Sequence, residues 1–223
     1  MKVIRTLTMA LIAVLPGANA MAGISATAVA QKVQALYDRT SSMKAGFEQV
    51  ASMKTLGISE HDEGMVYMKK DGKIRWEYKK PKEQLIVSNG TTIWFYMPSD
   101  RQVIIGSFAK SFKYKPTQTF LTGMGKILRD FKVRFDDSKE LNGVKDAYVL
   151  QLVPKKTSGG SPAKIVIAVN KKDFLITRSM IFDKYGNKTE IIFSNIRLNT
   201  AMADSLFTFV PPKDVEVIHS PAQ

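Results

Sequence analysis

The chain offers few side chains that could act as nucleophiles, bases or metal ligands. It contains two histidines, His61 and His219, and no cysteine. His61 lies in a polar stretch and His219 lies near the end of the chain, so they make a poor metal-ligand pair. Without cysteine, thiol chemistry, thiolate metal sites and disulfides are excluded. No histidine accompanies a Gly-x-Ser-x-Gly pattern, so a nucleophilic triad has no support either.

Paired carboxylates are the remaining source of acid–base chemistry. Asp136 and Asp137 are adjacent in the sequence. Adjacent residues of a strand point to opposite faces, so we interpret this pair as a solvated turn. The sequence also lacks the glycine-rich fingerprints that bind nucleotides. We therefore expect no enzyme activity, no metal and no cofactor.

The first residues have the pattern of a secretory signal peptide. Residues 1–5 are basic, residues 7–15 are apolar, and small residues follow up to Ala20. Cleavage is expected after Ala20, with Ala22 as the second choice. The apolar run is too short for a lasting membrane anchor. The sequence thus predicts a signal peptide over 1–20 and an exported, soluble, single domain over 21–223. The absence of cysteine excludes an N-terminal lipid modification.

The net charge of +13 falls to +11 in the mature chain, because the signal peptide carries Lys2 and Arg5. A basic exported protein suggests an acidic partner or an anionic surface, although the charge could also serve solubility alone. Aromatic residues among lysines can imitate a nucleic-acid surface. Since the chain is expected to be exported, we predict no nucleic-acid partner.

Residues 69–98 carry the most informative pattern, because they contain both tryptophans of the chain. Charged residues alternate with Ile74, Trp76 and Tyr78. One face of this predicted strand is therefore apolar and buried, and the other is polar and faces solvent. The next aromatic segment, 91–97, is apolar on both faces. Such a row can pack as an ordinary core or line a ligand surface, and the alternation alone favours the core.

The elements that hold this row are predominantly strands. A helix is predicted over 25–42, with Ser25 or Thr27 as its N-cap. Asp71-Gly72 and Asn89-Gly90 are hairpin signals. The predicted strands cover 45–50, 64–69, 74–78, 84–88, 91–97, 101–105, 131–135, 147–153, 164–169, 174–183 and 189–197. Roughly ten short antiparallel strands with helical insertions indicate one curved sheet or barrel.

A second helix is predicted within 112–131. Its apolar stripe consists of Phe120, Leu121, Met124, Ile127, Leu128 and Phe131. Gly123 and Gly125 lie inside it, and each costs a helix interior about 1 kcal/mol relative to alanine. A weak amphipathic helix over a curved sheet could cover an apolar pocket removably. The many methionines suit a surface that accepts varied apolar ligands.

The order of several short motifs resembles a known family. The motifs are Phe47-x-Gln49, Gly64, a basic residue six positions before Trp76, a turn at Pro81, Leu-Ile-Val-Ser-Asn-Gly over 85–90, Trp-Phe-Tyr over 94–96, and Phe-Thr-Phe-x-Pro-Pro over 207–212. Together they resemble the periplasmic outer-membrane lipoprotein carrier family, LolA. The resemblance spans essentially the whole mature chain.

The resemblance implies an unclosed antiparallel β half-barrel with an α-helical lid over a hydrophobic cavity. It implies a monomeric carrier in the periplasm of a Gram-negative cell, whose cargo is acylated lipoproteins. The carrier would receive them from an inner-membrane ABC-type release complex and deliver them to an outer-membrane lipoprotein receptor. A periplasmic half-barrel that binds or senses another lipid or a glycolipid is the alternative.

The site residues follow from the same resemblance. The cavity wall is expected to comprise Phe47, Ile74, Trp76, Tyr78, Trp94 and Tyr96, and the lid to comprise Phe120, Leu121, Met124, Ile127 and Leu128. Lys70-Asp71 stands where the family typically has Arg-Pro, so Lys70 is the expected latch of the lid. A lysine lacks the planar fork of arginine, so this latch would be looser or built differently. Ile74 replaces an aromatic residue of the family and remains apolar.

Overall fold

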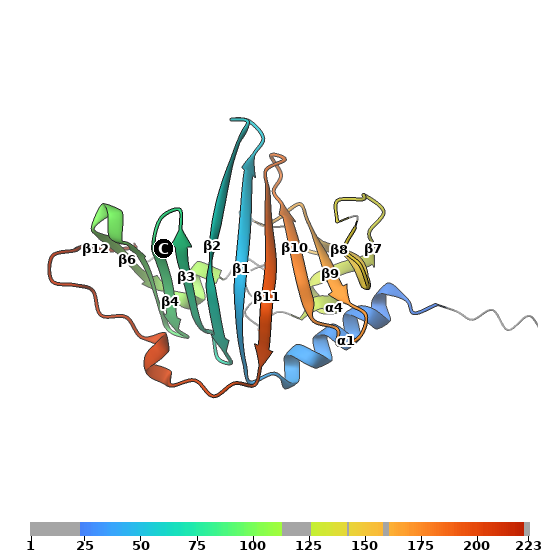
Figure 1. The fold of residues 1–223 in the computed structure, drawn as a ribbon, viewed down its shortest axis with the longest axis horizontal. Helices are drawn as coiled ribbons and strands as arrows, with labels where there is room; N and C mark the ends of the chain where they lie inside the picture. The colour runs from blue at the N-terminus through green and yellow to red at the C-terminus, as the bar shows by residue number, and fades with distance from the viewer. Residues whose placement is uncertain (1–22, 113–125, 142, 158–160, 221–223) are drawn as a thin grey trace, which may run out of the picture.

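The computed structural model describes residues 23–112, 126–141, 143–157 and 161–220. Within these residues twelve strands form one open sheet, in the order β12-β6-β5-β4-β3-β2-β1-β11-β10-β9-β8-β7 (Figure 1). The predicted signal peptide and most of the predicted lid lie outside the described residues.

The strands and helices have the following bounds. The first six strands are β1 Ser42–Met53, β2 Ile58–Lys69, β3 Lys73–Lys80, β4 Gln84–Asn89, β5 Thr92–Met97 and β6 Gln102–Ser107. The other six are β7 Phe131–Phe135, β8 Ala147–Pro154, β9 Lys164–Asn170, β10 Ile176–Phe182, β11 Lys188–Leu198 and β12 Glu216–His219. The helices are α1 Ala26–Arg39, α2 Phe108–Phe112 and α4 Ile127–Asp130, with short 3-10 turns η1 Pro98–Asp100 and η2 Asp204–Phe207.

The centre of the sheet is formed by strands from opposite ends of the chain. β1 pairs with β11, with Phe47 opposite Phe193. β2 to β6 extend from β1 on one side, and β10 to β7 extend from β11 on the other (Figure 1). The two outermost strands, β12 and β7, are not paired to each other, so the predicted unclosed sheet is confirmed. Every pair is antiparallel except β12 with β6, and β12 was not predicted.

Turn chemistry explains the sharp reversals on one side of the sheet. Between β2 and β3, Asp71 and Gly72 have φ values of 64° and 74°, the left-handed region that Asp-Gly turns supply. Between β4 and β5, Gly90 has φ of 94°, and the Asn89 side chain accepts hydrogen bonds from the backbone N–H groups of Thr91 and Thr92. Both predicted hairpins are therefore confirmed.

Helix α1 begins where the sequence predicts. The Ser25 hydroxyl caps it by accepting from the N–H of Ala28 at 3.2 Å. Its apolar side, with Val29 and Val33 fully buried, packs on a cluster contributed by β7 to β10. Figure 1 shows α1 and α4 close together at this end of the sheet. None of the helices among the described residues has the length and apolar character required to cross a bilayer.

The two faces of the sheet are covered differently. We call the face that carries Trp76 the inner face and the opposite one the outer face. The C-terminal segment crosses the outer face, where Phe207 is fully buried and Phe209 contacts the ring of Tyr96. Asp204 ties this segment to β2 and β3 through Lys69 at 2.5 Å and Lys73 at 2.8 Å. The inner face carries two apolar clusters, of which one lies under α1.

Candidate functional site

Four aromatic rings from three strands meet on the inner face. Phe47 of β1 lies 4.9 Å from the ring centroid of Trp76 and 5.1 Å from that of Tyr78. Phe193 of β11 lies 6.4 Å from Trp76 in an edge-to-face arrangement. Gly64 of β2 lies between Phe47 and Tyr78 in the register and leaves room for the Phe47 ring. Such offset and tilted arrangements are the favourable geometries for aromatic pairs.

The same face becomes predominantly apolar towards the β2–β3 turn, where the buried Ser88 hydroxyl, between Ile74 and Ile93, accepts from the N–H of Gly90. Met43, Met68, Ile74 and Phe108 are each at most 7% exposed there. On the outer face of β3, Arg75 and Glu77 form an ion pair at 2.5 Å. The predicted alternation of Ile74, Trp76 and Tyr78 with charged residues is therefore the observed one.

A polar group lies at the other end of the aromatic cluster. The Tyr78 hydroxyl donates to Gln49 Oε1 at 3.4 Å, and Gln49 Nε2 donates to Asp62 Oδ2 at 3.2 Å. Burial raises the pKa of Tyr78 to about 12; the nearby Asp62 charge also raises it, while the hydrogen bond with Gln49 lowers it. Tyr78 thus stays neutral and remains a hydrogen-bond donor over the ordinary pH range.

Two buried polar atoms on the inner face have no hydrogen-bond partner within the described part of the chain. They are Nε1 of Trp76 and the hydroxyl of Ser179. Ser179 lies in β10 between Ile167 and Ile191 and is 1% exposed. Unpaired buried polar groups are uncommon in folded proteins because each loses its hydration without compensation.

The register corrects one part of the predicted cavity wall. Trp76 pairs with Ile86, and Ile86 pairs with Phe95, so these three side chains share the inner face. Trp94 and Tyr96 are out of phase with Phe95 and therefore point to the outer face, where the C-terminal segment lies. Their assignment to the wall with Trp76 is wrong. The sequence predicted two apolar faces for this strand, but alternation alone could not say which one faced inward.

The predicted lid is described only at its end. Phe120, Leu121 and Met124 lie outside the described residues. Ile127 is 1% exposed and Leu128 is partly buried, and both pack on the cluster under α1. Phe131 begins β7, so the strand predicted over 131–135 is confirmed, and the extension of the predicted helical stripe to this residue is wrong. Phe131 is buried in the same cluster as Ile127. An apolar residue is needed there in a strand as much as in a helix, so its spacing also fitted the helical stripe.

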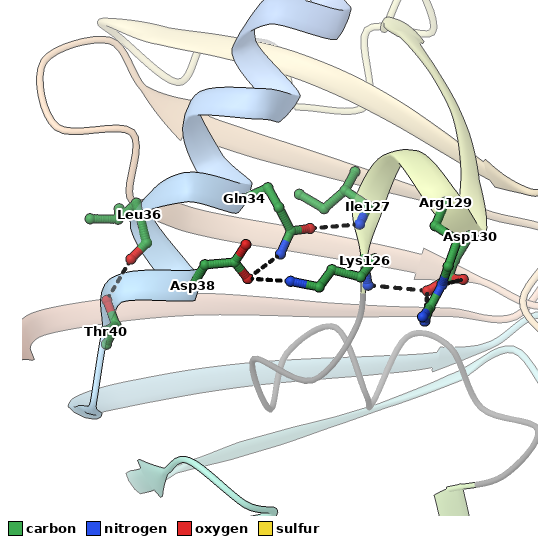
Figure 2. Close-up of polar contacts among 8 residues, drawn as sticks. All are labelled: Gln34, Leu36, Asp38, Thr40, Lys126, Ile127, Arg129 and Asp130. Atoms are coloured by element: carbon green, nitrogen blue, oxygen red, sulfur yellow. Dashed lines mark hydrogen bonds and ion pairs between the residues drawn. The ribbon is translucent and has the colours of Figure 1, made fainter.

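Polar contacts fasten the start of α4 to α1 (Figure 2). Gln34 Oε1 accepts from the backbone N–H of Ile127 at 2.7 Å, and Gln34 Nε2 donates to Asp38 Oδ1 at 2.8 Å. Lys126 Nζ donates to the same Asp38 oxygen at 2.8 Å. The N–H of Lys126 donates to Asp130 Oδ2 within its own turn. The first N–H groups of a helix lack intrahelical acceptors. Here the Gln34 side chain of α1 supplies the acceptor for the first N–H of α4.

Asp38 is the electrostatic centre of this junction. The hydrogen bond from Lys126 lowers its pKa most, against the opposing effect of burial, and the Lys70 charge contributes further. Lys70 is exposed in the β2–β3 turn, where its backbone N–H donates to Ser41. No hydrogen bond or ion pair of the Lys70 ammonium is recorded among the described residues. Its predicted latch role therefore stays a prediction.

Sequence reasoning did not identify Gln34, Asp38 or Lys126. Gln34 and Asp38 are four residues apart on the polar side of α1, which indicates only that they can touch each other. Lys126 lies 88 residues from Asp38, and no spacing rule connects them. Among the described residues, no group of three or more acidic or histidine side chains is arranged to hold a metal.

Comparisons with known proteins give a consistent picture. The sequence profile of a family described as "Outer membrane lipoprotein carrier protein LolA" matches residues 38–210. An outer-membrane lipoprotein carrier protein of Chromobacterium violaceum is 32% identical over 201 residues, covering 90% of this chain and 92% of that protein. One of Azotobacter vinelandii is 27% identical over 188 residues, covering 84% and 86%.

A solved structure supports the fold. An uncharacterized conserved protein from Thermus thermophilus superposes with a TM-score of 0.54 at 15% identity, covering 87% of this chain and 99% of that one. At this identity the likeness concerns the fold alone.

Proposed function

The chain belongs to the LolA family of outer-membrane lipoprotein carrier proteins, and on this premise we propose that it is a periplasmic carrier of lipoproteins. Its inner face would bind the acyl chains of lipoproteins that leave the inner membrane. The observation that supports this most is the continuous apolar cluster on the inner face, which extends from Met43 and Met68 to Trp76 and whose core members are at most 8% exposed. It is lined by methionine and aromatic side chains on an open sheet.

The chemistry of this surface suits an acyl chain. Each methylene group removed from water contributes about 0.8 kcal/mol. Rings of Phe47, Trp76 and Phe193 offer flat contact area, while Met43 and Met68 adapt to a flexible ligand. In this proposal Phe47, Ile74, Trp76 and Tyr78 remain wall residues, and Ile86, Ile93 and Phe95 take the places first given to Trp94 and Tyr96.

A carrier must also release its cargo. A cover that has to leave the apolar face before cargo enters would oppose binding and lower the net affinity. We assign this role to Phe120, Leu121 and Met124, while Ile127 and Leu128, which pack on the cluster under α1, would anchor the end of the cover. Lys70 would hold the cover closed together with Asp38, whose pKa is lowered chiefly by Lys126 and further by the charge of Lys70. An electrostatic latch of this kind can open without a nucleotide or a metal.

The expected partners follow from the family. Cargo would come from an inner-membrane ABC-type release complex, which would supply the energy, and pass to an outer-membrane lipoprotein receptor. The basic charge of the chain would favour contact with an acidic surface of one of these partners.

The test uses spheroplasts that retain a newly made lipoprotein. The purified protein should release the acylated lipoprotein into the medium. Ile74→Glu places a carboxylate at a wall position that is 5% exposed, and release should fall at least tenfold. Phe95→Glu does the same at a half-buried inner position and guards against a mere folding defect.

Val217→Glu is the matched control, because it makes an equivalent change at an exposed residue of β12. It should release cargo normally. Mass spectrometry of the released complex should find the lipoprotein with its acyl groups. If folded Ile74→Glu and Phe95→Glu variants release cargo as well as Val217→Glu does, the inner face is not the acyl site. Recovery of a glycolipid in place of lipoprotein would favour another lipid carrier.

A further inference from the structure

The inner face changes in polarity along its strands. At the β2–β3 turn it is predominantly apolar, with Met43, Met68 and Ile74 there, and the Ser88 hydroxyl beside Ile74 is buried and accepts from the N–H of Gly90. Four residues further along β3 it presents the Tyr78 hydroxyl with Gln49 and Asp62. The distance from Ile74 to Tyr78 is about 13 Å along the strand.

Trp76 lies between these two ends and carries the unsatisfied donor. Its Nε1 is buried and, within the described residues, has no acceptor. Indole N–H is a donor only, so nothing but an acceptor can satisfy it. The surrounding rings of Phe47, Tyr78 and Phe193 supply flat apolar contacts. A ligand with a carbonyl oxygen at this depth and a hydrocarbon chain on one side would complete the site.

We propose that the site binds its acyl ligand in one orientation. The Trp76 N–H donates to the carbonyl oxygen of the ester or amide that links the chain to its head. The hydrocarbon tail extends along Ile74 towards Met43 and Met68. The polar head lies towards Tyr78 and Gln49. This inference rests on the proposed function, because it names the part of the acyl ligand that Trp76 recognises.

Tyr78 and Gln49 are suited to the head of such a ligand. Their mutual hydrogen bond is long, at 3.4 Å, so both groups can accept or donate to a further partner. Asp62 holds the Gln49 amide from the far side at 3.2 Å. The glycerol hydroxyl or amide groups that flank an acyl ester match these donors and acceptors.

The first experiment isolates the carbonyl. Displacement of a fluorescent fatty-acid analogue is measured with 1-hexadecanoylglycerol, an ester, and with 1-hexadecylglycerol, the ether that lacks only the carbonyl oxygen. The wild-type protein should bind the ester roughly two- to tenfold more tightly, the net worth of one hydrogen bond. Trp76→Phe keeps a ring but removes the donor, so this preference should disappear while the ether still binds.

Trp94→Phe is the matched control, because Trp94 points to the outer face. It should keep the ester preference of the wild type. Trp94→Phe also leaves Trp76 as the sole tryptophan, since the chain has two. In this variant, acylglycerols brominated near the ester should quench Trp76 fluorescence more strongly than those brominated near the terminal methyl.

The outcomes separate this inference from the proposed function. If neither lipid displaces the analogue from the wild-type protein, both the proposed function and this inference are overturned. Binding of both lipids with equal affinity in wild type and Trp76→Phe would overturn the carbonyl contact and leave acyl binding intact. Quenching that is equal for both bromine positions, or stronger for the methyl end, would overturn the orientation.

Discussion

Gly64 is the residue at which the aromatic cluster depends most closely on the backbone. It lies in β2 opposite Phe47 on one side and Tyr78 on the other. A Cβ atom at this position would lie 1.8 Å from the carbonyl oxygen of Glu77 and 2.9 Å from Cε1 of Phe47. The first contact involves backbone, which cannot rotate away. The glycine thus allows β3 and the Phe47 ring to approach β2 together.

We expect Gly64→Ala to destabilise the protein by about 1–3 kcal/mol or more, the usual cost of overpacking. Urea unfolding followed by circular dichroism measures the change. Gly23→Ala is the control, since a Cβ atom there meets nothing within 4 Å. If Gly64→Ala unfolds at the same urea concentration as the wild type, the close approach of β3 and Phe47 to β2 does not require glycine at this position.

At the scale of single residues, alternation in the sequence predicted the dry face of β3 correctly. It could not place Trp94 and Tyr96, because both faces of β5 are apolar and only the register with β4 decides which one faces inward. The role of Gln34 could not be predicted from the sequence either. Its partner is the backbone N–H of Ile127, and a backbone group has no sequence signature.

Helix α4 is too short to be stable by itself. It has four residues and depends on tertiary contacts. Buried Ile127 anchors it by packing, and Gln34 anchors it by accepting from its first N–H. The Lys126–Asp38 pair is about half exposed, so it should contribute less, about 0.2–1 kcal/mol.

Gln34→Ala should therefore loosen the start of α4. It leaves a partly buried N–H unpaired, at a local cost of about 1–3 kcal/mol. Hydrogen exchange of the Ile127 amide, measured by NMR, should accelerate roughly tenfold to a hundredfold. Gln31→Ala changes an exposed residue of the same helix and should leave this exchange rate unaltered. Equal exchange in both variants would contradict a fastening role for Gln34.

The sequence predicted elements well where a pattern was local. The start of α1, both hairpins and most strands were correct because caps, turns and alternation are encoded within a few residues. β12 was missed, since its four residues pair with β6, more than a hundred positions earlier in the chain. The strand that begins at Phe131 was predicted correctly, but the helical stripe was extended to Phe131 wrongly, because burial against α1 also requires an apolar residue in a strand.

For the whole molecule, the borders of the open sheet determine how it meets other copies. β12 covers the backbone of β6, and β12 itself has only four residues. β7, at the opposite border, has five residues and carries Lys132 and Arg134. Short and charged border strands disfavour pairing between molecules. This supports the expectation of a monomer.

A chain that ends at Pro212 lacks β12 and uncovers β6. We expect it to self-associate, because the freed N–H and C=O groups of β6 can pair with a second copy. Size-exclusion chromatography with light scattering, at increasing protein concentration, measures this. A chain that ends at Ser220 keeps β12 and should remain a monomer. If the shorter chain is also monomeric at all concentrations, β12 does not protect this border.

The position of β1 beside β11 has a consequence for the order of folding. Ser41 and Asn199 form a hydrogen bond across 158 residues of chain at the end of this pair. Local hairpins close small loops, whereas this contact closes a very large one, and the entropic cost increases by about 0.6 kcal/mol with each doubling of loop length. Contacts between distant parts of the chain slow folding, because the entropy of closing the loop is lost before the contact forms. The middle of the sheet therefore requires nearly the whole chain, and the two halves can form their hairpins long before they join.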